Sequence, residues 1–358
     1  MSVSIKTPVF SENAQRVLCE RYLSKKANGR TISKCKHCEI IHETPEDMLR
    51  RVSFGNDEYY NLMASLDFLP NSPTLFNAGI KGAGTMSACF KFDIDDSMLG
   101  EDSIMDTACK AAAVQKWGGG VGFVLSNLRP KGAQIASTHG KACGPVAVLK
   151  MLHGVSEMIT QGGKRAGAQM GILSVDHPDV REFIHCKDED PQGLSTFNIS
   201  VAVTDEFMHR ATDFDTYGVI KERELLQEIC ESAWKTGDPG LYFIDEAERG
   251  NPTPWLGELS GTNPCGEVPL LNNEPCNLGS INLVNHVIYS ERQEVSVDFE
   301  RLAKTAYLAT KFLDEILDHN VFPDERIDRA AKITRKLGLG VMGWADMLTV
   351  LGVHYDSE

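Results

Sequence analysis

The chain has 358 residues, of which 42% are hydrophobic and 24% are charged, and it carries a net charge of −14. Its apolar runs are far shorter than the roughly 20 residues that span a bilayer, and its N-terminal MSVSIKTPVF lacks the apolar stretch of a secretory signal. The negative charge, with basic residues clustered only in pairs, disfavours a nucleic-acid polymer as partner but leaves small nucleotides open. We therefore expect a cytoplasmic protein with no membrane partner, large enough for one large core or about two ordinary domains.

Residues 1–60 are expected to form a small helical N-terminal region, because amphipathic patterns at 12–23 and 45–52 predict helices. The second helix has a strong start signal, since Thr44 can serve as the N-cap and Pro45 as a first-turn proline.

From about residue 60 the pattern changes to alternating helices and short strands. The predicted helices cover residues 103–117, 145–160, 178–186, 223–236, 302–319 and 344–351. The predicted strands cover residues 87–94, 121–125, 171–175, 198–203 and 281–287. This alternation is typical of an α/β architecture with helices packed around a sheet or a barrel.

The last residues, 356–358, resemble the N-cap and first turn of a further helix. We therefore expect a fragment, a split gene product or a truncated sequence, although a frayed terminus explains the same residues.

The most informative cysteine, Cys265, lies between Pro264 and Gly266, a combination that favours a tight turn able to project a thiol. Asn263 and Glu267 flank it at −2 and +2, so in an extended segment the three side chains would share one face. A thiol, an amide and a carboxylate together supply a redox atom, an orienting group and a base. Read alone, Cys265 also fits a buried structural cysteine.

Eight segments, in this order along the chain, resemble motifs of ribonucleotide reductase catalytic subunits. They are residues 71–79 (NSPTLFNAG), 86–90 (MSACF), 118–123 (GGGVGF), 161–165 (QGGKR), 198–202 (NISVA), 263–267 (NPCGE), 274–282 (EPCNLGSIN) and 337–343 (LGLGVMG). The resemblance covers about residues 45–358. The short gap between Cys265 and Cys276, the glycine run at 118–120 and the Ser-Pro-Thr at 72–74 are similar to the adenosylcobalamin-dependent class. The class that uses a separate diiron radical subunit has a longer gap and stays an alternative.

This resemblance implies that residues 61–358 form the first part of a ten-stranded α/β barrel with an internal finger loop, the C-terminal half being absent. It also implies that a deoxyadenosyl radical from adenosylcobalamin converts Cys265 to a thiyl, which takes the 3′-hydrogen of the ribose. Glu267 would accept the 3′-OH proton, Asn263 would hold the ribose hydroxyls, and Cys89 and Cys276 would reduce the substrate and become a disulfide. Three further positions are implied to line the substrate site: Thr74, Ala88 and Gly120.

The resemblance further implies a nucleotide effector, a dNTP or ATP, and several contacts for it. Asp96 would bind its deoxyribose, Arg129 and Lys131 in a first loop would contact its phosphates, and a second loop would pass its identity to the substrate. The implied residues of the second loop are Gln161, Lys164 and Arg165. The implied partners are the ribonucleotide substrate, a thioredoxin-like or other dithiol reductant, a polypeptide that supplies the C-terminal half, and a second copy in a homodimer.

One segment departs from the family pattern. Cys35 and Cys38 form a Cys-x-x-Cys pair, with His37 between them and with Cys19 and His42 nearby. Such a pair is one half of a zinc site, a redox pair or two surface thiols. Two hypotheses therefore stand beside the enzyme: a zinc-dependent module acting through this pair, and a non-catalytic nucleotide-binding partner of another subunit.

Overall fold

The computed structural model describes residues 4–25, 33–34, 41–136, 139–160, 167–188, 191–212, 220–291 and 294–357. The chain forms two compact units. Unit 1 comprises residues 1–88, 276–322 and 335–358, and unit 2 comprises residues 89–275 and 323–334. The expected boundary near residue 60 stays a prediction.

The centre of unit 2 is a sheet of five parallel strands in the order β4, β5, β6, β7, β8. Their bounds are β4 (Cys89–Asp93), β5 (Gly120–Val124), β6 (Gln169–Ser174), β7 (Phe197–Val203) and β8 (Gly240–Phe243). In the register of the first pair, Cys89 lies opposite Gly120. Strands β4 to β7 are almost continuously buried, which is typical of a parallel sheet covered on both faces, whereas β8 has one buried residue.

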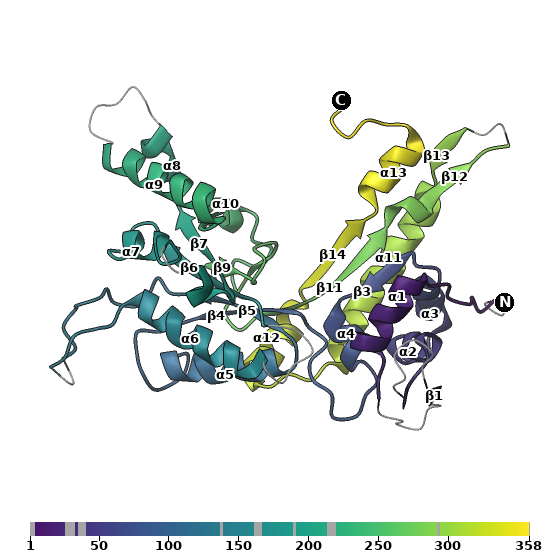
Figure 1. The fold of residues 1–358 in the computed structure, drawn as a ribbon, viewed down its shortest axis with the longest axis horizontal. Coiled ribbons are helices and arrows are strands. Elements are labelled where there is room, and N and C mark those ends of the chain that lie inside the picture. Colours follow the sequence, from purple (N-terminus) through teal and green to yellow (C-terminus); the bar gives the residue numbers. More distant parts are fainter. Residues whose placement is uncertain are drawn as a thin grey trace. The chain divides into compact units, whose positions relative to one another are not determined.

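Helices connect these strands, as the alternation predicted. The connecting elements are α5 (Ile104–Lys116), α6 (Pro145–Thr160), α7 (Val180–Ile184), the 3₁₀ turn η2 (Pro191–Leu194), α8 (Asp205–Thr212) and α9 (Ile220–Thr236). Unit 2 also contains α10 (Ile244–Arg249), which follows β8, and α12 (Glu325–Thr334) from later in the chain. Helix α5 packs against α6 and β5 (Figure 1). Its N-cap, Ser103, accepts a hydrogen bond from the Asp106 amide, and the chain leaves the helix at Gly118 with a φ of 93°. The predicted helix at 103–117 is therefore confirmed.

Unit 1 contains the N-terminal helices that the sequence predicted and several later elements. The helices are α1 (Glu12–Val17), the π-helix η1 (Leu18–Tyr22), α2 (Pro45–Val52), α3 (Asp57–Ala64), α4 (Ser72–Asn77), the 3₁₀ turn η3 (Leu283–His286), α11 (Phe299–His319) and α13 (Trp344–Leu351). Helix α2 begins with a capping box in which Thr44 and Asp47 bond reciprocally, so the start signal is confirmed. The hydrophobic core of unit 1 includes Phe68 and Phe312, whose rings pack edge to face.

The strands of unit 1 are β1 (Ser33–Lys34), β2 (Ile41–His42), β3 (Phe68–Pro70), β11 (Pro275–Asn282), β12 (Val287–Tyr289), β13 (Val295–Val297) and β14 (Leu337–Met342). They form two pairs, β1 with β2 and β12 with β13, and a group of three, β3, β11 and β14. Strand β11 pairs parallel with β14 and antiparallel with β3.

Two sequence predictions in unit 1 were wrong in detail. The strand expected at 281–287 ends at Asn282, because the His286 ring bonds back to the Asn282 carbonyl and to the Thr305 hydroxyl and so holds a 3₁₀ turn. The helix expected at 12–23 changes to a π-helix at Leu18. The wider turn puts both Cys19 and Leu23 into the core.

The α/β architecture expected from the alternation is confirmed. Across the described residues, no helix combines the length and the apolar character needed to cross a bilayer.

Candidate active site

Cys265 lies at the tip of a short hairpin in unit 2. Strands β9 (Gly261–Thr262) and β10 (Pro269–Leu270) pair antiparallel, and the chain between them turns at residues 263–268. The Gly266 amide donates to the Asn263 carbonyl at 3.2 Å, and Gly266 has a φ of 78°. The tight turn predicted from the flanking proline and glycine is thus confirmed. Cys265 is exposed, which does not fit a buried structural cysteine.

The side chains around the tip meet at the sulfur of Cys89. The buried Asn263 amide donates to Cys89 Sγ at 3.1 Å, and Cys89 Sγ donates to Glu267 Oε1 at 3.6 Å. The expectation that residues 263, 265 and 267 share one face was wrong, because the segment turns instead of running extended: Asn263 is buried whereas Cys265 and Glu267 are exposed. The turn brings the amide and the carboxylate to the first residue of β4.

Glycines on β5 make room for the hairpin. A Cβ added to Gly122 would lie 1.8 Å from the Thr262 carbonyl oxygen, and one added to Gly120 would lie 2.7 Å from Pro264 Cγ. Asn198 on β7 adds a bond from its amide to the Pro264 carbonyl at 2.9 Å. The hairpin therefore packs backbone against backbone across the sheet, and this close contact explains the glycine at position 120 without invoking a ligand.

The remaining predicted reaction residues lie in unit 1. Cys276 is fully buried on β11, and its Sγ bonds to the Asn277 carbonyl at 3.4 Å. Ala88 is buried and donates its amide to the Cys276 carbonyl at 3.1 Å. Thr74 is buried on α4 and its hydroxyl donates to the Met86 carbonyl at 3.1 Å. The pairing of Cys89 with Cys276 and the substrate contacts of Thr74, Ala88 and Gly120 stay predictions.

Two of the predicted effector residues share a cavity in unit 2 of about 390 Å³. Asp96 and Arg129 both line it, and Arg129 Nε donates to Asp96 Oδ2 at 2.5 Å. Lys131 does not line this cavity, and its ammonium instead pairs with Glu182 at 2.8 Å. The geometry thus brings together Asp96 and Arg129 but not Lys131.

The other predicted ligand residues lie outside the described residues. These are Gln161, Lys164 and Arg165 of the second effector loop and the zinc candidates Cys35 and Cys38. In the part of the chain that the structure describes, no group of three or more His, Cys, Asp or Glu side chains is arranged to hold a metal ion.

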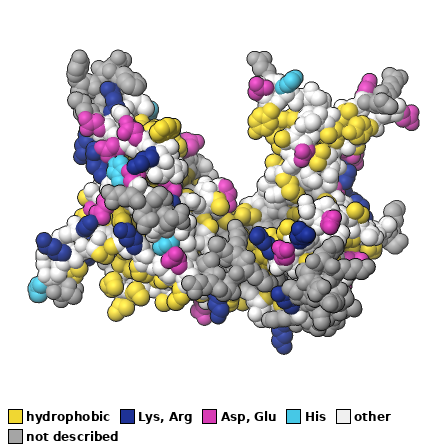
Figure 2. Space-filling model, viewed as in Figure 1, with side chains coloured by type: hydrophobic (Ala, Val, Ile, Leu, Met, Phe, Trp, Pro, Cys, Tyr) yellow, Lys and Arg dark blue, Asp and Glu magenta, His cyan; other side chains and the backbone are white. Residues whose placement is uncertain are grey.

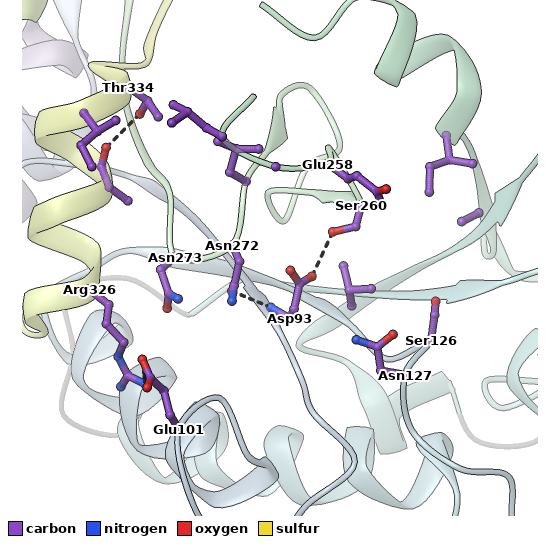
Figure 3. Close-up of a pocket in the computed structure, with 18 of the residues that line it drawn as sticks. Asp93, Glu101, Ser126, Asn127, Glu258, Ser260, Asn272, Asn273, Arg326 and Thr334 are labelled. Carbon is purple, nitrogen blue, oxygen red and sulfur yellow. Dashed lines mark hydrogen bonds and ion pairs between the residues drawn. The ribbon is translucent and has the colours of Figure 1, made fainter. Parts of the chain in front are cut away.

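A second cavity of unit 2, of about 740 Å³, was missed by the sequence reasoning (Figure 3). Its polar wall includes Asp93, Ser126, Ser174 and Thr204, each at or just after the C-terminal end of a parallel strand. A polar residue following each buried strand was the available signal, since ligands of parallel sheets bind at this edge. Below this wall Lys91 is fully buried, and burial lowers the pKa of its ammonium while Asp93 acts in the opposite direction.

The parallel strands crossed by a cysteine-bearing hairpin define an α/β barrel-type fold with an internal finger loop, as expected. The family model "Ribonucleotide reductase, barrel domain" matches residues 87–221 and 213–358, and "Ribonucleotide reductase, all-alpha domain" matches residues 56–83. The chain belongs to the ribonucleotide reductase family, and the resemblance drawn from its motifs is confirmed.

Individual relatives agree with this assignment. The chain is 43% identical, over 98% of its length and 47% of the relative, to the vitamin B12-dependent ribonucleoside-diphosphate reductase of Thermoplasma acidophilum. It is 41% identical, over 96% of its length and 51% of the relative, to the protein of the same name from Mycobacterium tuberculosis. The chain therefore spans about half the length of these curated relatives. The fold matches the Actinobacillus ureae class Id ribonucleotide reductase alpha subunit with a TM-score of 0.76, over 97% of this chain and 62% of that chain, at 24% identity.

Proposed function

We propose that the protein containing this chain reduces ribonucleoside diphosphates to 2′-deoxyribonucleotides by a thiyl-radical mechanism that depends on adenosylcobalamin, and so supplies precursors for DNA. The observation that carries the proposal is the hairpin tip, where Asn263 and Glu267 converge on the Cys89 sulfur and Cys265 is exposed on the same turn. The relatives at 41–43% identity carry "vitamin B12-dependent" and "ribonucleoside-diphosphate" in their names. The relative named ribonucleoside-diphosphate reductase subunit alpha from Chlamydia trachomatis, whose name does not include vitamin B12, is only 27% identical, and this difference supports the cobalamin class.

The first half of the proposed reaction uses the hairpin. The Cys265 thiyl takes a hydrogen atom from C3′ of the ribose and returns it at the end of the cycle. Glu267 accepts the proton of the 3′-OH, a role that suits an exposed carboxylate on the same turn as the thiol. Asn263 holds the ribose hydroxyls through its amide, which the turn and Cys89 already orient.

The second half uses the reducing pair. Cys89 and Cys276 together supply two electrons and two protons: the 2′-hydroxyl leaves as water, hydrogen replaces it at C2′, and the two thiols become one disulfide. The hydrogen bond from Ala88, the residue before Cys89, to the Cys276 carbonyl supports this pairing. A thioredoxin-like or other dithiol reductant then restores the thiols.

The residues at the tip fit a bulky cofactor. Cys265 and Gly266 are exposed, and a Cβ added to Gly266 would meet only Met170 Cε, at 4.0 Å. These two residues would face adenosylcobalamin. When bound, the cofactor supplies the hydrogen-atom acceptor that converts the Cys265 thiol to its radical.

Further partners belong to the same proposal. The cavity of Asp96 and Arg129 takes a nucleotide effector, a dNTP or ATP, with Arg129 as its phosphate contact. A second copy binds over α5 and α6, where Met105 and Met158 are exposed and hydrophobic side chains gather on the surface (Figure 2). A polypeptide corresponding to the other half of the relatives completes the site, and the protein acts in the cytoplasm.

The test is a reduction assay on the complete protein with cytidine diphosphate and dithiothreitol. We expect deoxycytidine diphosphate to form only when adenosylcobalamin is added. Activity that does not depend on adenosylcobalamin but requires a diiron protein would contradict the cofactor assignment. A complete protein that binds nucleotides but reduces none under either condition would favour the non-catalytic alternative.

A further inference from the structure

One face of strand β4 contacts the hairpin at two separate places. Side chains two residues apart in a strand point to the same side, so Cys89, Lys91 and Asp93 form one row. Cys89 contacts the tip of the hairpin, as described above. Lys91 and Asp93 contact its base, where Ser260 precedes β9.

The base contacts are charged, and they join the buried Lys91 to Asp93 and Ser260, which are half-buried at the wall of the 740 Å³ cavity. The Lys91 ammonium donates to the Ser260 hydroxyl and pairs with Asp93 Oδ1 at 2.6 Å, and the Ser260 hydroxyl donates to the same carboxylate oxygen at 3.0 Å. Figure 3 shows Asp93 and Ser260 pointing toward each other across the wall of the cavity. The Lys91 side chain is 0% exposed and fits beneath Gly261, where an added Cβ would lie 3.6 Å from Lys91 Cε. Asp93 and Ser260 therefore satisfy the Lys91 ammonium at a position that water does not reach.

The segment that leaves the hairpin is fixed to the same strand. The Asp93 amide donates to Asn272 Oδ1 at 3.0 Å, and the Asn273 amide donates to the Lys91 carbonyl at 3.0 Å. Both ends of the hairpin are thus bonded to β4 at Lys91 and Asp93. The tip, by contrast, meets β4 through a sulfur atom, which is a weak acceptor and a weak donor.

We infer that Lys91, Asp93 and Ser260 form a clamp that sets the position of the hairpin along β4 and thereby holds Asn263 and Glu267 against the Cys89 sulfur. The three are positioning residues, because their side chains bond to one another. Only two residues separate Ser260 from Asn263, so a shift at the base moves the tip by a similar distance. The catalytic consequence of the clamp rests on the proposed function, whereas its mechanical consequence does not.

The mechanical test measures how fast iodoacetamide alkylates Cys89, by mass spectrometry of the complete native protein. Cys89 is 5% exposed, so it reacts only when the tip opens. Lys91→Met keeps the length of the side chain but removes the ammonium, and Asp93→Asn removes the opposite charge. We expect each to speed alkylation of Cys89 about tenfold or more, as expected for the loss of a hydrogen bond to a charged group.

The matched control is Lys187→Met. Lys187 is also a largely buried lysine of unit 2, with Asp238 at 2.6 Å, but it bonds to the Phe197 carbonyl and not to the hairpin. The Lys187→Met variant should keep the rate of Cys89 alkylation within about twofold of the rate in the unmodified protein. An equal acceleration in Lys187→Met, or no acceleration in folded Lys91→Met, would overturn the clamp.

If Lys91→Met does not fold, Ser260→Ala is tested in its place, because it deletes the shared hydroxyl with little change in volume. Faster alkylation of Cys89 in Ser260→Ala would support the clamp, and an unchanged rate would overturn it.

The catalytic arm uses the reduction assay. A tip displaced from Cys89 should lower kcat about 10- to 100-fold with little change in KM, because misplacement affects the reacting geometry more than substrate binding. Lys91→Arg, which keeps the charge, should recover part of kcat. If the unmodified protein reduces no nucleotide while Lys91→Met still speeds alkylation of Cys89, the proposed function fails and the clamp stands. Faster alkylation of Cys89 with an unchanged kcat would overturn the catalytic consequence of the clamp.

Discussion

Two polar clusters of unit 2 differ in what holds them together. At the hairpin tip, Asn263 and Glu267 reach the Cys89 sulfur at 3.1 and 3.6 Å. In the Arg326 cluster, the guanidinium bonds Asp106 at 2.7 and 3.1 Å and Asp324 at 2.8 and 2.9 Å. The tip, where we propose that the reaction takes place, is held by a few weak contacts to sulfur, whereas the cluster that fixes α12 to α5 uses several short charged hydrogen bonds. The Cys265, Glu267 and Arg326 variants below should each change either the activity or the stability and leave the other unchanged.

The largest effect is expected from Cys265→Ser. A hydroxyl does not form the required radical at the tip, so reduction should fall by roughly 10³-fold or more, as on loss of other reaction-centre nucleophiles. The measurement is deoxynucleotide formation by the complete protein with adenosylcobalamin. Cys230→Ser on α9 changes an exposed cysteine away from the tip and should keep its activity. Substantial reduction by Cys265→Ser would remove Cys265 from the reaction.

Glu267→Gln should have the next largest effect. The amide retains the shape of the carboxylate but accepts no proton from the 3′-OH, so kcat should fall about 100-fold. Because Glu267 is exposed, the free energy of unfolding should change by less than about 0.5 kcal/mol in urea titrations. Glu258→Gln, an exposed carboxylate on the segment that leads into the hairpin, is the control and should keep kcat. An equal loss in both variants would indicate a general effect of charge.

Arg326→Met should show the opposite pattern, a loss of stability. Removing partly buried charged hydrogen bonds should lower the free energy of unfolding by about 2 kcal/mol. The neighbouring exposed Arg329→Met should cost less than about 0.5 kcal/mol. Urea titrations of both variants at neutral pH measure this difference. Equal losses of the free energy of unfolding would show that the Arg326 cluster adds no more stability than an exposed arginine.

The same cluster predicts a pH dependence. Hydrogen bonds from Arg326 hold the pKa of Asp106 and of Asp324 below the ordinary value of 3.8. Folded carboxyls with lowered pKa values add stability above the unfolded value, and this contribution is lost as pH falls through the folded values. Arg326→Met should therefore lose less stability than the unmodified protein between neutral pH and about pH 3. Parallel losses in the two proteins would contradict this role of Arg326.

The smallest effect concerns the effector cavity. Arg129→Gln should weaken nucleotide binding about tenfold, since one charged hydrogen bond to phosphate is lost. Lys131→Gln should leave the affinity unchanged, because the structure places Lys131 on Glu182 and outside the cavity. Equilibrium dialysis with dATP measures both. A larger loss in Lys131→Gln would restore the original interpretation of the first loop.

Much of unit 2 could be predicted from the sequence because its signals are local. Ser103 and Gly118 mark the two ends of α5, and Pro264 and Gly266 mark the turn. Apolar runs alternating with amphipathic helices indicate a parallel sheet without any knowledge of the partners. For the same reason the family motifs, which are also local, lead to the right family and fold.

The remainder depends on contacts that no local pattern contains. The turn at 263–268 was predicted, but its contact with Cys89 was not, because it brings Asn263 and Glu267 to a residue on another strand. The π-helix at Leu18 and the 3₁₀ turn at Leu283 arise from packing and from a histidine bonded to Thr305. Lys131 looked like a phosphate ligand because its position in the loop was known and its partner Glu182 was not. The clamp at Lys91 was missed because a lysine in a strand is usually exposed.

The close packing of the hairpin on β5 also affects how the protein folds. The hydrogen bond from Asn263 to Cys89 joins residues 174 positions apart. The glycines of β5 that contact the hairpin have no side chain that could bind the hairpin before the sheet has formed. Contacts of such long range form slowly, after the strands beneath them have paired. During this interval the Cys89 thiol, which is buried in the folded protein, is accessible to oxidants. We therefore expect the yield of native protein from denaturant to depend on a reductant present during refolding more than on one added afterwards.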